Sequence, residues 1–359
     1  MKRAMKLIAG IIAAASLLSV AACNGAGAAD TVKIGVAMPT KSLQRWNQDG
    51  DNMKKQLEAA GYTVDLQYAN DDVSVQISEV ENMITGGCDV LVIASIDGSS
   101  LGAVLDKAKA ANIPVIAYDR LLMNSDGVSY YATFDNFRVG EIQGEYVVNT
   151  LDLEKAEGPF NIEFFAGDPA DNNAKFFFDG AMSVVQKYVD SGKLVVVSGQ
   201  TAFDQVATAG WKSENAQNRM DNLITAYYAD GTVLDVVLCS NDSTAFGVET
   251  SLENSGKFTI GENWPIITGQ DCDKPNTKNM IAGKQSMSVF KDTRTLAAKV
   301  VEMVTAIVTK KTVPVNDTES YDNGKLKVPT FLCEPVFADK DNYKEILIDS
   351  GYYKAADLE

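Results

Sequence analysis

The sequence predicts an α/β protein of two similar lobes, each a parallel sheet with helices on both faces. Apolar segments typical of strands alternate with amphipathic helices along the chain. The strands are too many for one sheet, and the roughly 330 residues that follow an export signal exceed one typical domain. Polar residues stand directly after several strands, where ligands of open parallel sheets bind. The pattern therefore indicates one ligand-binding cleft.

The first half contains five apolar segments that we interpret as strands: 32–38, 62–68, 89–95, 114–118 and 128–133. The segments between them have helical periodicity. In 73–86, for example, Val73, Ile77, Val80 and Ile84 recur on one helical face. This order predicts a parallel sheet covered on both faces.

The second half repeats the scheme, with strands expected at 160–165, 194–198, 233–239, 265–268 and 286–290. A helix at 292–309 carries an apolar stripe typical of a core-facing helix rather than a membrane or partner helix. Residues 314–329, rich in Asp, Asn and Gly, are expected to form a long connection. A last strand at 330–336 and a helix at 341–350 follow it.

Residues 1–22 are predicted to be a lipoprotein signal peptide. Basic residues precede an apolar core, Leu7 to Val20, that is too short for a stable membrane span. The segment ends in Val20-Ala-Ala-Cys23, which resembles the bacterial lipobox, whose cysteine is lipidated and becomes the mature N-terminus. We therefore expect Cys23 to anchor an extracytoplasmic protein to the membrane through a flexible tether, 23–31. An ordinary signal peptide with an incidental Cys23 is the alternative.

Composition excludes several classes of function. The formal net charge is −16, and so acidic a surface repels nucleic acid. The absence of histidine excludes histidine-dependent triads and most zinc sites. Cys88, Cys239, Cys272 and Cys333 stand singly, without a metal or redox motif. The first two lie in apolar strand contexts typical of small core residues, whereas Cys272 could pair with another group.

The residues at the predicted strand ends match what a monosaccharide needs. Sugar hydroxyls both donate and accept hydrogen bonds, and the C–H faces of the ring are apolar, so a site needs carboxylates, amides and cations in one plane and aromatic rings above and below. The candidate ligand-binding residues are Lys41, Arg45, Trp46, Asp119, Arg120, Asp171, Asn172, Asn173, Trp211, Asn241, Asp271 and Lys291.

Each candidate also has a purely structural interpretation. Asp119-Arg120 could be a helix cap followed by a solvated charge. The run 168–173 could be a turn and an N-cap before a helix that starts near Ala174, and Trp211 could be a surface anchor. The convergence of all these residues on carboxyl-end loops favours the binding site.

Several motifs together resemble those of the periplasmic aldose receptors of sugar ABC importers, a group that includes the multiple sugar-binding and xylose-binding proteins. The resemblance runs from about Val32 to the C-terminus. Its motifs are Met38-Pro-Thr-Lys…Arg45-Trp46, Glu79-Val-Glu-Asn-Met-Ile, Asp89-Val-Leu-Val-Ile-Ala-Ser-Ile-Asp-Gly, Val115-Ile-Ala-Tyr-Asp-Arg120, Tyr130-Tyr-Ala-Thr-Phe-Asp-Asn136, Asp171-Asn-Asn-Ala174, Gly269-Gln-Asp271 and Asn316-Asp-Thr.

This resemblance implies the type I periplasmic binding protein fold, with two Rossmann-like lobes joined by a three-segment hinge. The expected N-terminal lobe is 32–135 plus 292–314, and the expected C-terminal lobe is 136–291 plus 328–359. The three crossings are expected near 134–137, 289–292 and 312–330. All the candidate ligand-binding residues except Asn172 are implied by the family's cleft, although Lys41 stands where related xylose receptors vary. No counterpart of the galactose receptor's calcium loop is found, so neither a metal nor a cofactor is expected.

The function expected is a monomeric receptor that captures an aldopentose or aldohexose and delivers it to the permease of an ABC importer. A sugar sensor for chemotaxis or a two-component system is the alternative, and the sequence does not separate the two. A glycosidase that uses Asp119 and Asp271 is a third possibility. Neighbouring cations would keep both carboxylates ionised and leave no general acid, so we expect no enzyme. A transcription regulator is not expected, because no helix-turn-helix module precedes residue 31.

Overall fold

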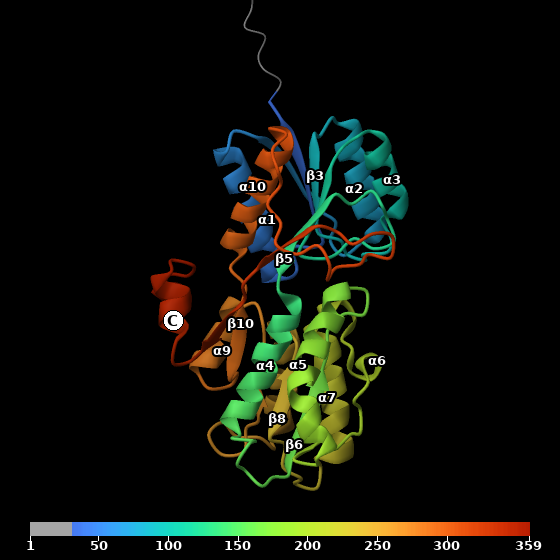
Figure 1. Ribbon diagram of the computed structural model, residues 1–359. Helices are drawn as coiled ribbons and strands as arrows, with labels where there is room; N and C mark the ends of the chain where they lie inside the picture. The colour runs from blue at the N-terminus through green and yellow to red at the C-terminus, as the bar shows by residue number, and fades with distance from the viewer. Residues whose placement is uncertain (1–30) are drawn as a thin grey trace, which may run out of the picture.

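The computed structural model describes residues 31–359 and confirms the predicted α/β architecture of two lobes (Figure 1). The signal peptide at 1–22, Cys23 and nearly all of the tether lie outside the described residues. Among residues 31–359, no helix combines the length and the apolar character that a bilayer crossing requires.

The first lobe is built on a six-stranded parallel sheet with the order β11-β5-β4-β3-β1-β2. Its strands are β1 (Lys33–Met38), β2 (Thr63–Tyr68), β3 (Val90–Ile93), β4 (Val115–Tyr118), β5 (Tyr130–Phe134) and β11 (Thr330–Cys333). Apolar clusters on both faces of the sheet hold two helices each. These are α1 (Gln44–Ala59) with α10 (Thr293–Val308), and α2 (Val73–Thr85) with α3 (Gly102–Ala110).

The second lobe repeats this plan on a four-stranded parallel sheet with the order β7-β6-β8-β9. A bridge between Gln270 and Val289 leads on to a two-stranded antiparallel ribbon. Its strands are β6 (Phe160–Phe165), β7 (Leu194–Val195), β8 (Val236–Cys239), β9 (Ile266–Ile267), and the ribbon's β10 (Met287–Phe290) and β12 (Val336–Asp339).

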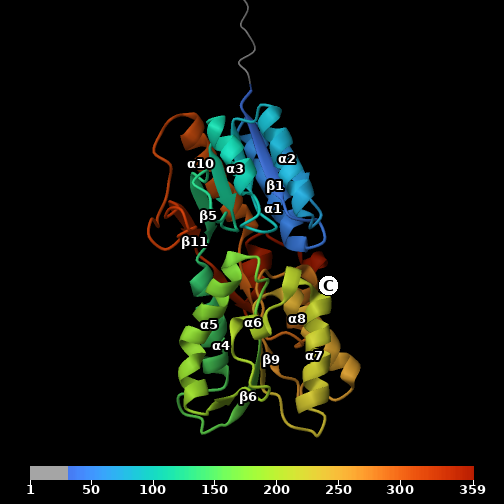
Figure 2. The ribbon, with the colours of Figure 1, turned by 90° about the vertical axis from the view of Figure 1, so that its right-hand side faces the viewer.

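Helices cover both faces of the second sheet through separate apolar clusters (Figure 2). One face carries α4 (Asn136–Thr150) and α5 (Asn172–Asp190), and the other carries α7 (Ser213–Tyr227) and α8 (Asp242–Ser255). The remaining elements are α6 (Phe203–Val206), η1 (Ala209–Trp211), α9 (Lys274–Ile281), η2 (Lys344–Asp349) and η3 (Ala355–Asp357).

Two of the three chain crossings between the lobes lie where they were expected. β5 leads into α4 through Asp135, and β10 leads into α10 through 291–292. In both, an aspartate caps the helix: Asp135 accepts from the Arg138 backbone N–H and Asp292 from that of Arg294. An N-cap stabilises its helix by about 1 kcal/mol. Each aspartate therefore favours a helix that starts directly beyond the hinge, which keeps the hinge segment short.

The third crossing lies at residues 334–335, not in the expected segment 312–330. Residues 330–333 pair with β5 in the first lobe, whereas 336–339 pair with β10 in the second. The expected single strand at 330–336 is therefore wrong, and its first part belongs to the first lobe rather than to the C-terminal lobe. Pro335 explains the break, since proline has no backbone N–H to continue a ladder.

Helices α4 and α5 meet backbone to backbone because each carries a glycine at the contact. A Cβ at Gly140 would lie 2.0 Å from the carbonyl oxygen of Phe177, and one at Gly180 would lie 2.1 Å from that of Phe137. Any larger residue would separate the two helices. The contact fixes the start of α5 close to the hinge.

The four cysteines among the described residues are all buried and free. Cys88 and Cys239 lie in the apolar clusters, as their sequence contexts predict. Cys272, whose state the sequence left open, is fully buried beside the ribbon and forms no disulfide.

A buried carboxyl on α8 gives the fold a predictable pH dependence. Glu249 is 2% exposed, and burial raises its pKa from 4.5 to about 8 although Asn279 donates to it. The folded state therefore binds the Glu249 proton more tightly than the unfolded chain does. The contribution of Glu249 to the free energy of unfolding consequently falls as pH rises from about 4.5 to about 8.

We expect Glu249→Gln to remove this part of the pH dependence and to stabilise the protein most at the alkaline end. Urea unfolding at several pH values measures the effect, with exposed Glu253→Gln as the control. Parallel pH profiles for Glu249→Gln and the unmodified protein would contradict the prediction.

Candidate functional site

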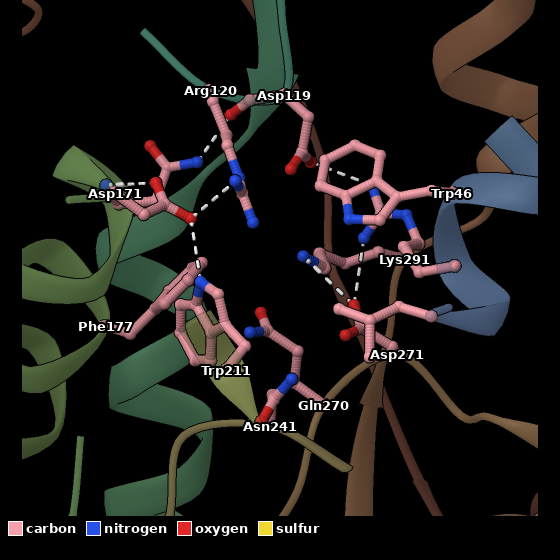
Figure 3. A pocket seen from close by; sticks show the side chains of 13 residues that line it. Trp46, Asp119, Arg120, Asp171, Phe177, Trp211, Asn241, Gln270, Asp271 and Lys291 are labelled. Atoms are coloured by element: carbon pink, nitrogen blue, oxygen red, sulfur yellow. Dashed lines mark hydrogen bonds and ion pairs between the residues drawn. The ribbon is translucent and has the colours of Figure 1, made fainter. Parts of the chain in front are cut away.

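A cavity lies between the lobes, where the carboxyl ends of both sheets face each other (Figures 1 and 3). The cavity is lined by residues from the start of α1, from the segments that follow β4, β8, β9 and β10, and from α5 and η1. They are Leu43, Arg45, Trp46, Asp119, Arg120, Asp171, Asn173, Phe177, Trp211, Asn241, Gln270, Asp271 and Lys291.

Most of the predicted candidates line this cavity, and two do not. Lys41 is exposed, and its amino group lies 4.8 Å from the centre of the Tyr68 ring. Asn172 is the first residue of α5 and is absent from the lining. All the other candidates among the described residues are present.

Sequence reasoning missed three lining residues, Leu43, Phe177 and Gln270. Gln270 directly precedes Asp271 at a strand end, so the same rule could have found it. Phe177 follows Asn173 by four residues on α5 and therefore shares its helical face. Leu43 is the N-cap residue of α1, where sequence offers no comparable signal.

Arg45 is the centre of the charge network. Its guanidinium contacts Asp49 on the same helix, Asp119 at 2.8 Å and Asp271 at 2.9 Å. Burial alone would lower the pKa of Arg45, but these carboxylates raise it well above its ordinary value. Lys291 pairs with Asp271 at 3.1 Å. Because Asp271 belongs to the second lobe and Arg45 to the first, the ion pair joins the two lobes.

Asp119 is held in an uncommon backbone conformation by bonds from both lobes. Its φ is 57°, in the left-handed region, which is strained for a residue other than glycine. Its carbonyl oxygen accepts from Tyr131 at 2.6 Å, from Thr133 at 3.0 Å and from the Asn173 amide. Burial raises the pKa of the Asp119 carboxyl, but nearby cations, Arg45 above all, outweigh it and lower the pKa. The side chain is therefore an ionised acceptor.

Arg120 pairs with a carboxylate of the other lobe rather than with its neighbour Asp119. Its Nε lies 3.1 Å from Asp171, and its Nη1 donates to the Ser95 carbonyl at 3.0 Å. Both Asp119 and Arg120 are buried, which excludes a solvated cap. Asp171 caps α5, as the structural interpretation expected, and it also accepts from the Trp211 indole N–H at 3.2 Å. Burial raises the pKa of Asp171 against the opposing effect of Arg120.

Two indole rings from different lobes flank the centre of the cavity (Figure 3). Trp46 is 3% exposed and Trp211 is 4% exposed, so neither is a surface anchor. The Arg120 guanidinium lies 4.9 Å from the centre of the Trp46 ring. The rings of Phe177 and Trp211 pack edge to face, with their centres 6.2 Å apart. Gly167 makes room for Trp211, because a Cβ there would lie 1.8 Å from the indole.

Two amide side chains, those of Asn241 and Gln270, also line the cavity. Asn241 caps α8 by accepting from the Thr244 backbone N–H at 3.0 Å, and its side chain lines the cavity. Gln270 donates to the Ser240 carbonyl at 3.1 Å. The Gln270 Oε1 is buried and has no donor within residues 31–359. It is an acceptor that a ligand hydroxyl could satisfy.

The arrangement suits binding better than bond cleavage. Asp119 and Asp271, the carboxylates considered for glycoside hydrolysis, both contact Arg45, so neither has the apolar surroundings that a general acid needs. Within residues 31–359, no group of three cysteine, aspartate or glutamate side chains is placed to hold a metal ion. The cavity therefore offers ionised acceptors, fixed cations, amides and two apolar rings to an uncharged polar ligand.

A family model, the periplasmic binding protein domain, matches residues 34–312. The chain belongs to the periplasmic binding proteins. The family that the sequence motifs indicated is thus confirmed, together with the fold that it implied.

This periplasmic binding protein has relatives that align along nearly its whole length. It is 53% identical to the multiple sugar-binding periplasmic receptor ChvE of Rhizobium radiobacter, over 99% of this chain and 100% of that one. It is 37% identical to the D-xylose-binding periplasmic protein of Escherichia coli (strain K12), over 93% of this chain and 95% of that one.

Among solved structures, it resembles an ABC transporter solute binding protein from Clostridium phytofermentans with bound β-D-glucose. The sequence identity is 66%, the TM-score is 0.88, and the match covers 91% of this chain and 100% of the other. A carbohydrate transporter solute binding protein from Chloroflexus aurantiacus in complex with D-glucose is 33% identical, with a TM-score of 0.82 and coverage of 91% and 98%.

Proposed function

We propose that this protein captures one neutral aldopentose or aldohexose, in the pyranose form, between its lobes. The observation that carries the proposal is the pair of buried indoles, Trp46 and Trp211, which come from different lobes and flank a ring of ionised and amide groups. A pyranose has apolar C–H faces for the indoles and hydroxyls for the polar ring. The sugar-binding names of the relatives and the glucose-bound structures support this class of ligand.

We further propose that the protein works outside the cytoplasm as a monomeric lipoprotein that delivers sugar to an ABC importer. The periplasmic relatives and the resemblance to ABC transporter solute binding proteins support the location and the transport role. The Val20-Ala-Ala-Cys23 motif supports a lipid anchor at Cys23. Closure would follow from contacts that the sugar makes to both lobes at once, since these favour the closed state.

We propose a binding role and no catalytic one. The relatives named above are described as receptors and binding proteins. The lowered pKa of Asp119 beside Arg45 also supports this role, because a carboxylate kept ionised cannot protonate a leaving group.

Calorimetry with xylose, glucose, galactose and arabinose tests the proposal. We expect a micromolar or lower Kd, about −8 kcal/mol or better, for at least one of them. Trp211→Ala should weaken binding by about 1–3 kcal/mol, because it removes one apolar platform, and it should suppress the fluorescence change on sugar addition.

Trp264→Ala is the matched control, since that indole donates to the Lys284 carbonyl in the core of the second lobe, away from the cavity. The proposal fails if none of the four sugars releases heat while an amino acid or nucleoside binds. Unaltered affinity in both Trp211→Ala and Trp46→Ala would instead show that the indoles are structural.

A further inference from the structure

The last residues of the chain form a segment, 341–359, that lies beside the junction of the lobes (Figure 1). We call it the C-terminal segment. Leu347 and Tyr353 pack in an apolar cluster with Cys272 and Phe290 of the second lobe. Asp357 pairs with Lys274 of α9 at 3.3 Å. The C-terminal segment therefore packs on the second lobe. It also bonds to α10 of the first lobe, through Tyr352 to Thr293 at 3.1 Å and through the Ser350 carbonyl to Arg294 at 3.1 Å.

Tyr353 connects this segment to the first lobe through its hydroxyl group. The hydroxyl accepts from Gln44 Nε2 at 2.8 Å and from Gln48 Nε2 at 3.1 Å, both on α1, and it donates to the Cys272 carbonyl at 2.9 Å. A hydroxyl can donate one hydrogen bond and accept two. All of that capacity is used, and the side chain is 3% exposed.

These partners stand next to the residues that carry the ion pair between the lobes. Gln44 precedes Arg45, and Cys272 follows Asp271, whose carboxylate lies 2.9 Å from Arg45. Asp271 has φ 98° and Cys272 has φ 52°, so this turn is strained. Such a backbone persists only when its surroundings hold it. Tyr353 supplies one of the bonds that do so, on the side away from the cavity.

We propose that Tyr353 is a positioning residue for the candidate site and that it stabilises the closed state. Its hydroxyl bonds both to α1 of the first lobe and to the Cys272 carbonyl of the second, so separation of the lobes must break one side of this set of bonds. An interaction present only in the closed state raises ligand affinity without touching the ligand. The inference rests on the proposed function.

The test is the kinetics of glucose binding to Tyr353→Phe, followed by stopped-flow fluorescence. The substitution keeps the ring in its apolar cluster and removes only the hydroxyl. We expect the dissociation rate constant to rise about tenfold, the size of one or two lost hydrogen bonds, while the association rate constant stays unchanged. A residue that only supports the fold would lower the melting temperature and leave the dissociation rate constant unchanged.

Tyr343→Phe is the control, because that tyrosine belongs to the same segment and its hydroxyl bonds to no residue in 31–359. Gln44→Met removes one of the two partners on α1 and should also speed dissociation. The double variant should lose less binding free energy than the sum of the losses in the two single variants, because both substitutions remove the bond between Gln44 and Tyr353.

The outcomes separate this inference from the proposed function. If the unmodified protein binds none of the four sugars, the proposed function falls and the inference falls with it. If the unmodified protein binds glucose and Tyr353→Phe releases it at the same rate, only the role of Tyr353 is overturned.

Discussion

Arg45→Met is expected to reduce sugar affinity by about 3–5 kcal/mol, the cost of leaving buried charges without a partner. Methionine fills a similar volume, but Asp49 and Asp119 would lose their ion pair with Arg45, and Asp271 would keep only Lys291. Burial already raises the pKa of Asp49 to about 6 in the presence of Arg45. Without the guanidinium, the ion pair between Asp271 and the first lobe is lost.

Calorimetry with glucose measures the loss, and circular dichroism checks the fold. Arg138→Met is the matched control, because Arg138 also pairs with two carboxylates, Glu141 and Glu145, but on the half-exposed surface of α4. Exposed pairs contribute little, so this variant should bind normally. A folded Arg45→Met variant with full affinity would show that sugar binds elsewhere.

Arg120→Ala is expected to weaken sugar binding by roughly 2–4 kcal/mol while the fold survives. The substitution takes the cation from the buried Asp171 carboxylate and the donor from the Ser95 carbonyl, and each unmatched buried group costs about 1–3 kcal/mol. It also removes the cation from the face of Trp46. Both losses weaken the part of the cavity that joins β4 to the start of α5.

A calorimetric titration of Arg120→Ala beside Lys175→Ala checks this prediction. Lys175 lies on α5, the helix that Asp171 caps, but it pairs with Asp179 on the exposed face. The control should bind like the unmodified protein. Equal affinities for the two variants would mean that the pair between Arg120 and Asp171 supports the fold alone.

The sequence by itself determined the two-lobed α/β plan and most of the positions around the cavity. Asp119, Asn241 and Asp271 each follow an apolar strand within four residues, and this local pattern is visible without coordinates. Parallel strands bring their carboxyl ends to one edge of a sheet, so residues at such ends converge even when they are far apart in the chain. The first two hinge crossings were expected from the family resemblance, and the first of them lies within the motif Tyr130-Tyr-Ala-Thr-Phe-Asp-Asn136.

Only the tertiary structure decided which charges meet. Arg120 adjoins Asp119 in sequence but pairs with Asp171, and Arg45 finds Asp271 across the cleft. Lobe closure is a long-range property that local patterns do not encode. Asn172 lies outside the cavity while Asn173 lines it, because successive residues on a helix point about 100° apart.

The third crossing and the role of the C-terminal segment were also beyond the sequence. Residues 330–336 look like one apolar strand, and only the pairing partners show that they divide between two sheets at Pro335. The hydroxyl of Tyr353 reaches Gln44 from the far end of the chain. Such contacts depend on how the two folded lobes pack against each other, and a local sequence pattern does not determine that packing.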